Sequence, residues 1–167
     1  FDGDSQALAR AGEIGFGKPA ATIEDAVASA DAVFHCVPVG AMSATARASI
    51  AAMKAGAILT DVGSVKGNVA RDFRSLGRVD IHVIPGHPIA GTEKSGPDAG
   101  FASLFDGRWC ILTPEQGGSP DYVAATDRLA AFWTALGSKV ERMDAQRHDL
   151  VLAVTSHIPH LIAYNMV

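Results

Sequence analysis

The hydrophobic positions of this chain fall into two kinds of segment that alternate along the sequence. Short, nearly continuous apolar runs predict buried strands at 31–37, 57–63, 80–86, 107–114 and 138–144. Apolar and small residues at helical spacing predict helices at 5–11, 21–30, 41–56, 66–76, 119–137 and from 144 onward. Strands that alternate with helices in this way indicate an α/β fold with a mostly parallel sheet covered on both faces.

Local signals mark the ends of two of these helices. Thr22 is placed as an N-cap, with Asp25 three residues later in a weak capping-box pattern. Ser119 is the N-cap of a longer helix that has Pro120 at its first position and Gly137 past its end. These signals place both helices between predicted strands, as the alternation requires.

The loops that follow three of the predicted strands carry more polar residues and glycines than chain reversal needs. They are PVGA at 38–41, DVGSVKG at 61–67 and GHPIAGTEKSG at 86–96. The carboxyl ends of parallel strands meet at one edge of a sheet, where α/β folds bind their ligands. We therefore expect a site at this edge, with His87 of the third loop as its most conspicuous side chain.

The composition argues against several classes of partner. A net charge of −4 does not suit binding to nucleic acid or to an anionic membrane, because both favour basic patches. No apolar run approaches the roughly 20 residues that a membrane-spanning helix needs, and no signal segment opens the chain. Cys36 and Cys110 lie in apolar runs, which predicts buried, reduced thiols and a cytoplasmic location.

Both ends of the chain are interpreted as interior to a longer protein. Phe1 stands where an initiator Met would, and Val167 falls inside a helical pattern that has no stop signal.

The first residues suggest one part of a dinucleotide site. Such a site needs a glycine-rich turn after a strand and, about 20 residues later, an acidic residue for the ribose hydroxyls. The stretch GFGK at 15–18 follows no predicted strand and lacks a third glycine, so it does not supply the turn. The stretch FDGDS at 1–5 offers Asp2 as the ribose carboxylate, with Asp4 as the alternative and a solvated turn as the non-functional interpretation. A carboxylate there favours NAD over NADP, whose 2′-phosphate it would repel.

Five stretches together resemble the prephenate/arogenate (cyclohexadienyl) dehydrogenases of tyrosine biosynthesis. They are CVPVGA, TDVGSVKG, GHPIAGTEKSG, FDGRWCILTP and HDLVLAVTSHIPHLIAY, which span most of the chain in the order of that family. The resemblance implies a Rossmann-like, doubly wound domain over residues 1–143 that lacks the N-terminal strand, glycine loop and helix of the family. Residues 144–167 would then be the first helix of a C-terminal helical domain that forms a homodimer.

The same resemblance implies an activity and a set of site residues. The reaction is the NAD-dependent oxidative decarboxylation of prephenate or arogenate, with His87 as the general base and Ser64 as its partner near the nicotinamide. The substrate contacts implied by the resemblance are Thr92, Glu93, Ser156 and His160. The cofactor contacts are Asp2, Val37, Pro38, Val39, Gly63 and Ser64. The family's substrate-binding arginine would lie beyond Val167.

Several alternatives remain open at the level of the sequence. Lys66 and Lys94 are either contributors to substrate binding or solvated loop lysines. His148, His157 and His160 could suggest a metal site, but no cysteine or acidic cluster completes a ligand set, so no metal is expected. Other functions are a β-hydroxyacid-type dehydrogenase and a non-catalytic NAD-binding domain, and the latter would tolerate the loss of His87.

Overall fold

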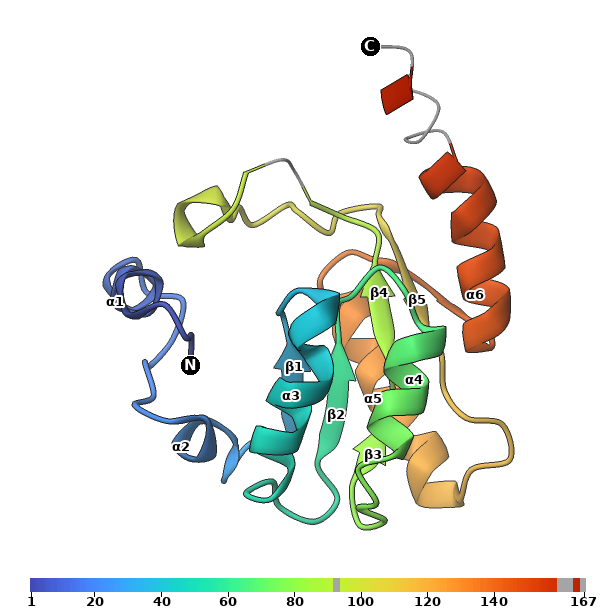
Figure 1. The fold of residues 1–167 in the computed structure, drawn as a ribbon, viewed down its shortest axis with the longest axis horizontal. Helices are drawn as coiled ribbons and strands as arrows, with labels where there is room; N and C mark the ends of the chain where they lie inside the picture. Colours follow the sequence, from blue (N-terminus) through green and yellow to red (C-terminus); the bar gives the residue numbers. More distant parts are fainter. Residues whose placement is uncertain (92–93, 159–163, 166–167) are drawn as a thin grey trace.

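The protein is built around strands that lie side by side in the middle of the molecule (Figure 1). The computed structural model describes residues 1–91, 94–158 and 164–165. Three parallel strands form the first part of the sheet, in the order β1 (Ala32–His35), β2 (Ile58–Asp61) and β3 (His82–Val83). The second part has the order β4 (Gly86–Pro88), β5 (Trp109–Leu112) and β6 (Lys139–Arg142).

The two parts of the sheet meet at Ile84 and Pro85, the only residues between β3 and β4. The Ile84 N–H donates to Leu59 O of β2 at 2.9 Å, and Pro85 O accepts from the Thr113 N–H at 2.9 Å. The predicted strand 80–86 is therefore two short strands with a bend between them. As a result His87, expected in a loop, lies inside β4.

One strand pairing departs from the parallel arrangement predicted from the sequence. β4 and β5 are antiparallel, with His87 opposite Ile111, whereas β5 and β6 are parallel. Antiparallel neighbours need no helical crossover, and the connection from β4 to β5 contains only the short 3-10 helix η1 (Pro97–Ala99) among its described residues. A full helix connects β5 to β6, as a parallel pair requires.

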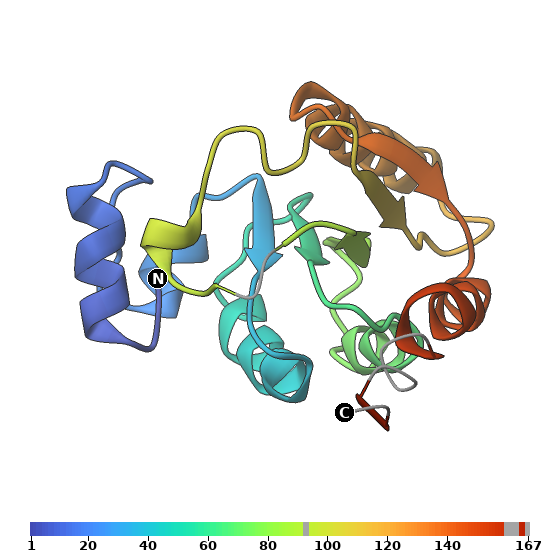
Figure 2. The same ribbon diagram turned by 90° about the horizontal axis from the view of Figure 1, so that it is seen from above.

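Helices cover both faces of the sheet, as the alternating pattern predicted. α3 (Val39–Ile50) and α4 (Gly67–Arg74) lie on one face, and α5 (Pro120–Ala135) lies on the other (Figure 2). The remaining helical elements are α1 (Ser5–Glu13), α2 (Ile23–Val27), α6 (Ala145–Leu152) and a π-helical turn, η2 (Ala153–His157). The predicted caps are confirmed, because Thr22 Oγ1 accepts from Asp25 N at 3.1 Å and Ser119 Oγ accepts from Tyr122 N at 3.2 Å.

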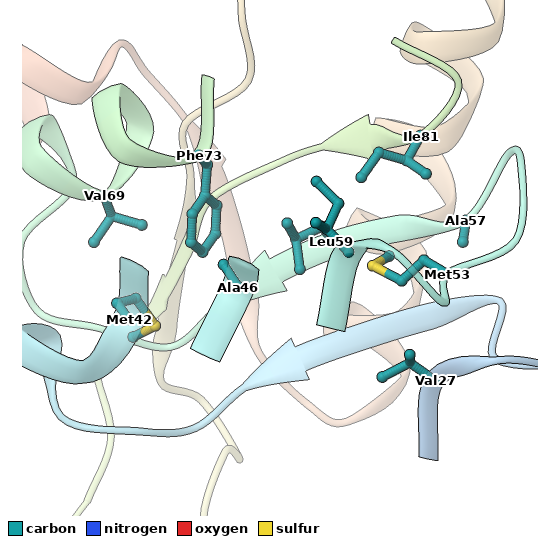
Figure 3. Close-up of a cluster of buried hydrophobic side chains, with 10 residues drawn as sticks. Val27, Met42, Ala46, Met53, Ala57, Leu59, Val69, Phe73 and Ile81 are labelled. Atoms are coloured by element: carbon teal, nitrogen blue, oxygen red, sulfur yellow. The ribbon is translucent and has the colours of Figure 1, made fainter. Parts of the chain in front are cut away.

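Strand β2 joins two hydrophobic cores. All four of its residues are buried, and successive side chains point to opposite faces. Leu59 packs with Met42, Val69 and Phe73 in the core beneath α3 and α4 (Figure 3). Ile58 packs with Leu129 and Trp133 in the core beneath α5. This double burial explains why the strand is apolar without alternation.

Two expectations about exposure are decided by the structure. Cys110 is buried and has a free thiol, as predicted. Cys36 is also free, but it is exposed, because β1 ends at His35 and Cys36 follows it. None of the helices within the described ranges has the length and apolar character that crossing a bilayer demands.

Candidate active site

A buried ion pair lies where β2 ends and β4 begins. Asp61 is the last residue of β2, Lys66 immediately precedes α4, and both side chains are fully buried. Lys66 Nζ donates to Asp61 Oδ2 and, at 2.8 Å, to Gly86 O. Asp61 also accepts from Gly63 N at 2.8 Å and from Gly86 N at 3.2 Å. The pair therefore fixes the backbone immediately before His87.

Burial and pairing act in opposite directions on these two groups. Burial raises the pKa of the Asp61 carboxyl, and the charge and hydrogen bond of Lys66 oppose this shift. Burial lowers the pKa of the Lys66 ammonium, and Asp61 opposes that shift in turn. Of the two interpretations of Lys66, the solvated loop lysine is wrong, because the side chain is fully enclosed. Lys94 is exposed.

His87 contacts a second histidine beneath the surface. His87 is 8% exposed, and the side chain of His148 on α6 is completely buried. His87 Nδ1 lies 2.9 Å from His148 Nε2, and the two rings meet edge to face at 65° with centroids 5.1 Å apart. This is a hydrogen bond between the sheet and α6, because His87 belongs to β4.

A carboxylate continues the series on the far side of His148. His148 Nδ1 lies 2.8 Å from Asp149 Oδ1. Asp149 also accepts from the backbone N–H groups of Lys66 at 2.7 Å and Gly67 at 2.8 Å, at the start of α4. A Cβ atom on Gly67 would lie only 2.8 Å from Asp149 Oδ2, so glycine lets the carboxylate approach this closely. The series His87–His148–Asp149 thus ends on the N-terminus of α4.

The environment of the series affects the pKa of two of its members. Burial lowers the pKa of His148, although the hydrogen bond and charge of Asp149 oppose the shift. Burial acts to raise the pKa of Asp149, but hydrogen bonds from Lys66 N, His148 and Gly67 N outweigh it and lower that pKa overall. An ionised Asp149 beside a neutral His148 is the state that both directions favour.

Two of the predicted cofactor residues, Asp2 and Val37, line one cavity beside β1. This cavity of about 560 Å³ is lined by Asp2, Val37, Cys36 and residues of β1 and α2. Asp2 Oδ1 accepts from Asp4 N at 2.8 Å, while Asp4 caps α1 by accepting from Gln6 N at 2.8 Å. Both carboxylates therefore accept local backbone N–H groups, and Asp2 rather than Asp4 lines this cavity. A cavity of about 630 Å³ between α4, the loop after β5 and the start of α6 does not include His87.

The structure locates the other predicted residues to different extents. Pro38 precedes α3, Val39 begins it, and Gly63 is buried at the end of β2. Ser64 is exposed next to Gly63, and its side chain makes no hydrogen bond within the described part of the chain. Thr92, Glu93 and His160 lie outside the described residues. The backbone of Ser156 belongs to η2, and its side chain is not described.

Sequence reasoning missed three of the residues that surround His87. Asp61 gave one signal, because a charged residue inside an apolar run needs a buried partner. His148 gave another, because it shares an inward helical face with Leu152 at a spacing of four residues, and both are buried. Asp149 had no comparable signal, since its partners are backbone groups of a distant helix. Among the described residues, no group of His, Cys, Asp or Glu side chains is arranged to hold a metal ion.

Comparison with known proteins gives a consistent family. Residues 1–142 match the family model described as "Prephenate dehydrogenase, nucleotide-binding domain". A cyclohexadienyl dehydrogenase from Zymomonas mobilis is 44% identical over 146 residues, which are 87% of this chain and 48% of that protein. A prephenate dehydrogenase from Bacillus subtilis is 33% identical over 110 residues, which are 66% of this chain and 29% of that protein. The chain spans half or less of the length of these curated relatives.

Solved structures agree with the sequence matches. Prephenate dehydrogenase from Aquifex aeolicus, in complex with hydroxyphenyl propionate and NAD+, superposes with a TM-score of 0.87 at 31% identity. The match covers 99% of this chain and 57% of that one. Arogenate dehydrogenase from Synechocystis gives a TM-score of 0.85 at 27% identity, covering 98% of this chain and 57% of that one.

Proposed function

The chain belongs to the prephenate dehydrogenase family through its nucleotide-binding domain, and from this premise we propose that the full-length protein oxidatively decarboxylates prephenate, arogenate or both. The products are 4-hydroxyphenylpyruvate and tyrosine, respectively, and NAD is the oxidant. The observation that supports this function best is the placement of His87. A nearly buried imidazole at the carboxyl edge of the sheet, hydrogen-bonded to His148, is suited to accept a substrate proton.

The residues near the end of β1 are suited to the adenosine side of NAD. Asp2 lines the cavity beside Val37, where its carboxylate can accept hydrogen bonds from the ribose hydroxyls. Pro38 follows β1 and is the N-cap residue of α3, which begins at Val39 without a side-chain capping hydrogen bond. A Cβ atom on Gly63 would lie only 2.9 Å from Asp61 Oδ2, so glycine leaves room for the Asp61 carboxylate at the end of β2. NAD, when bound, supplies the hydride acceptor.

His87 is the proposed general base. As hydride leaves the carbon that bears the ring hydroxyl, the hydroxyl becomes acidic, and a neutral imidazole can take its proton. The ring then loses its carboxylate as carbon dioxide and becomes aromatic, which supplies the driving force. General base catalysis of this kind typically contributes about 10²–10⁴-fold in rate. We propose that the exposed Ser64 hydroxyl holds the reacting hydroxyl in line with His87.

The remaining contacts are assigned to the substrate. Thr92 and Glu93 follow β4 in sequence, and Ser156 and His160 follow α6. These two segments follow, in sequence, the elements that carry His87 and His148. A homodimer, formed through helices that continue from α6, and a cytoplasmic location complete the proposal.

The proposal is tested by assaying the full-length protein with prephenate and arogenate, each with NAD and NADP. We expect reduction of the cofactor together with release of carbon dioxide, and a higher kcat/KM with NAD because the Asp2 carboxylate repels a 2′-phosphate. An Asp2→Asn variant should narrow the preference for NAD, whereas Asp127→Asn, on the exposed face of α5, should leave it unchanged. Absence of turnover with all four combinations contradicts the proposed function.

A further inference from the structure

The hydrogen bonds around Asp149 determine which atoms of the series donate. The backbone N–H groups of Lys66 and Gly67 can only donate, and they approach different oxygens of the carboxylate. An ionised carboxylate can only accept, so the third partner of Asp149, the His148 ring, donates through Nδ1–H. Asp149 therefore sets the direction of hydrogen-bond donation along the series His87–His148–Asp149.

This direction passes through His148 to His87. A neutral imidazole carries one proton, so His148 with its proton on Nδ1 presents a lone pair at Nε2. His87 Nδ1 lies 2.9 Å from that lone pair and must be the donor. The His87 ring then carries its proton on Nδ1, and Nε2 is the nitrogen that can accept another one.

The surrounding charges are consistent with a neutral His148. The side chain is fully buried, and burial lowers its pKa. Lys66, at the start of α4, also disfavours a second positive charge, while Asp149 on α6 and Asp61 on β2 favour it. The burial effect is the largest of these and lowers the pKa overall, which favours the neutral His148 ring.

We propose that His148 and Asp149 are positioning residues that hold His87 in its Nδ1–H tautomer and so present Nε2 to the substrate. This inference rests on the proposed function, and it adds the two residues that would make His87 an effective base. Their position also matters, because both lie on α6 and neither belongs to the sheet. A base on β4 is thereby oriented by a helix that follows the nucleotide-binding domain.

The proton transfer balances in this arrangement. The O–H bond of the substrate hydroxyl breaks, its proton binds to His87 Nε2, and its electron pair forms the ring carbonyl as hydride departs to the nicotinamide. His87 becomes an imidazolium whose Nδ1–H still donates to His148 Nε2. Asp149, hydrogen-bonded to the other side of His148, stabilises the positive charge without itself taking a proton. Loss of carbon dioxide leaves its bonding electron pair on the ring oxygen as a phenolate, and return of the proton from His87 Nε2 to that oxygen gives the phenol and restores His87.

The first test replaces each positioning residue in the full-length protein. Asp149→Asn removes the charge and leaves one amide oxygen for the three N–H groups that the carboxylate accepts, so the Nδ1–H forms of His148 and His87 are no longer enforced. We expect kcat to fall by about tenfold or more for Asp149→Asn and His148→Asn, since a wrong tautomer can cost up to about 10⁴-fold in a comparable triad. KM should change little, and Asp149→Glu should restore part of kcat.

The pH profile separates positioning from a structural role. With Asp149→Asn, the acidic limb of kcat/KM should move to lower pH, because the carboxylate no longer stabilises the protonated form of His87. Arg147→Gln, an exposed neighbour on α6, is the matched control and should keep the kcat and the pH profile of the parent.

Nitrogen-15 NMR of the histidine rings tests the tautomer without any turnover. The parent should show His87 protonated at Nδ1, and Asp149→Asn should shift it toward the Nε2–H form. An Nε2–H tautomer in the parent overturns the inference, as does parent-like kcat in both Asp149→Asn and His148→Asn. A parent that oxidises neither substrate contradicts the proposed function instead, and the NMR result still decides the tautomer.

Discussion

At the scale of single residues, Asp61 and Lys66 form an ion pair in which both side chains are fully buried. Lys66 donates to Asp61 and to Gly86 O, and Asp61 also accepts from the N–H groups of Gly63 and Gly86, so protein groups stand in place of water around both charges. Such a pair adds little net stability compared with apolar residues of the same size, but removal of one member leaves a buried charge without a partner. The pair is best understood as a device that fixes the start of β4, next to His87.

Replacement of Lys66 by Met should therefore destabilise the protein strongly. We expect the free energy of unfolding to fall by about 3–5 kcal/mol, measured by chemical denaturation of the full-length protein. Lys54→Met is the matched control, because Lys54 forms an exposed ion pair with Asp31 and should cost less than about 1 kcal/mol. Equal losses in the two variants would show that the buried pair has no special structural role.

Single residues also show the limit of what the sequence predicts. Asp61 lies inside an apolar run, which indicated that its buried charge needs a partner of opposite charge or hydrogen-bond donors. Nothing in the sequence identified Lys66 as that partner. The choice depends on the turn between β2 and α4, which brings a residue five positions later back over the end of the strand. The same limit applies to His148 and Asp149, whose partners are 61 and 82–83 residues away in the sequence.

At the scale of elements, periodicity predicted most helices and strands, because local burial decides them. The pattern located α3, α4, α5, β1, β2, β5 and β6, and both predicted caps are present. The pattern did not predict the break between β3 and β4 or the antiparallel pairing of β4 with β5. Both depend on hydrogen bonds between distant segments, such as Thr113 N to Pro85 O.

The contact between α6 and α4 should make stability depend on pH. The pKa of His148 is lowered from 6.5, so the unfolded chain binds its proton more readily than the folded one. Stability from this group is present above pH 6.5 and is lost as the pH falls through the folded pKa. The lowered pKa of Asp149 has the same sign, with its loss beginning below its ordinary value of 3.8.

Unfolding free energies between pH 5 and 8 measure this effect. Between about pH 5 and 6.5, the unfolding free energy of the parent should fall more steeply with decreasing pH than that of His148→Gln. The two slopes should differ by up to about 1.4 kcal/mol per pH unit. Gln146→Asn changes an exposed, non-titratable neighbour on α6, so it serves as the control and should keep the slope of the parent. Identical slopes for the parent and His148→Gln would mean that the folded state does not resist protonation of His148.

At the scale of the whole molecule, the carboxyl edge of the sheet gathers residues from distant parts of the chain. β4 supplies His87, the segment from β2 to α4 supplies Asp61 and Lys66, and α6 supplies His148 with Asp149. The sequence predicted this edge as the site, because loops after parallel strands meet there. It could not predict that α6 would pack against α4 and complete the surroundings of His87.

The most direct test of the account is the steady-state kinetics of His87→Asn in the full-length protein, together with its affinity for NAD. The account predicts that kcat falls by at least about 100-fold while NAD binds as in the parent, because only the proton acceptor is lost. Turnover at the rate of the parent would contradict the central claim that His87 is the base.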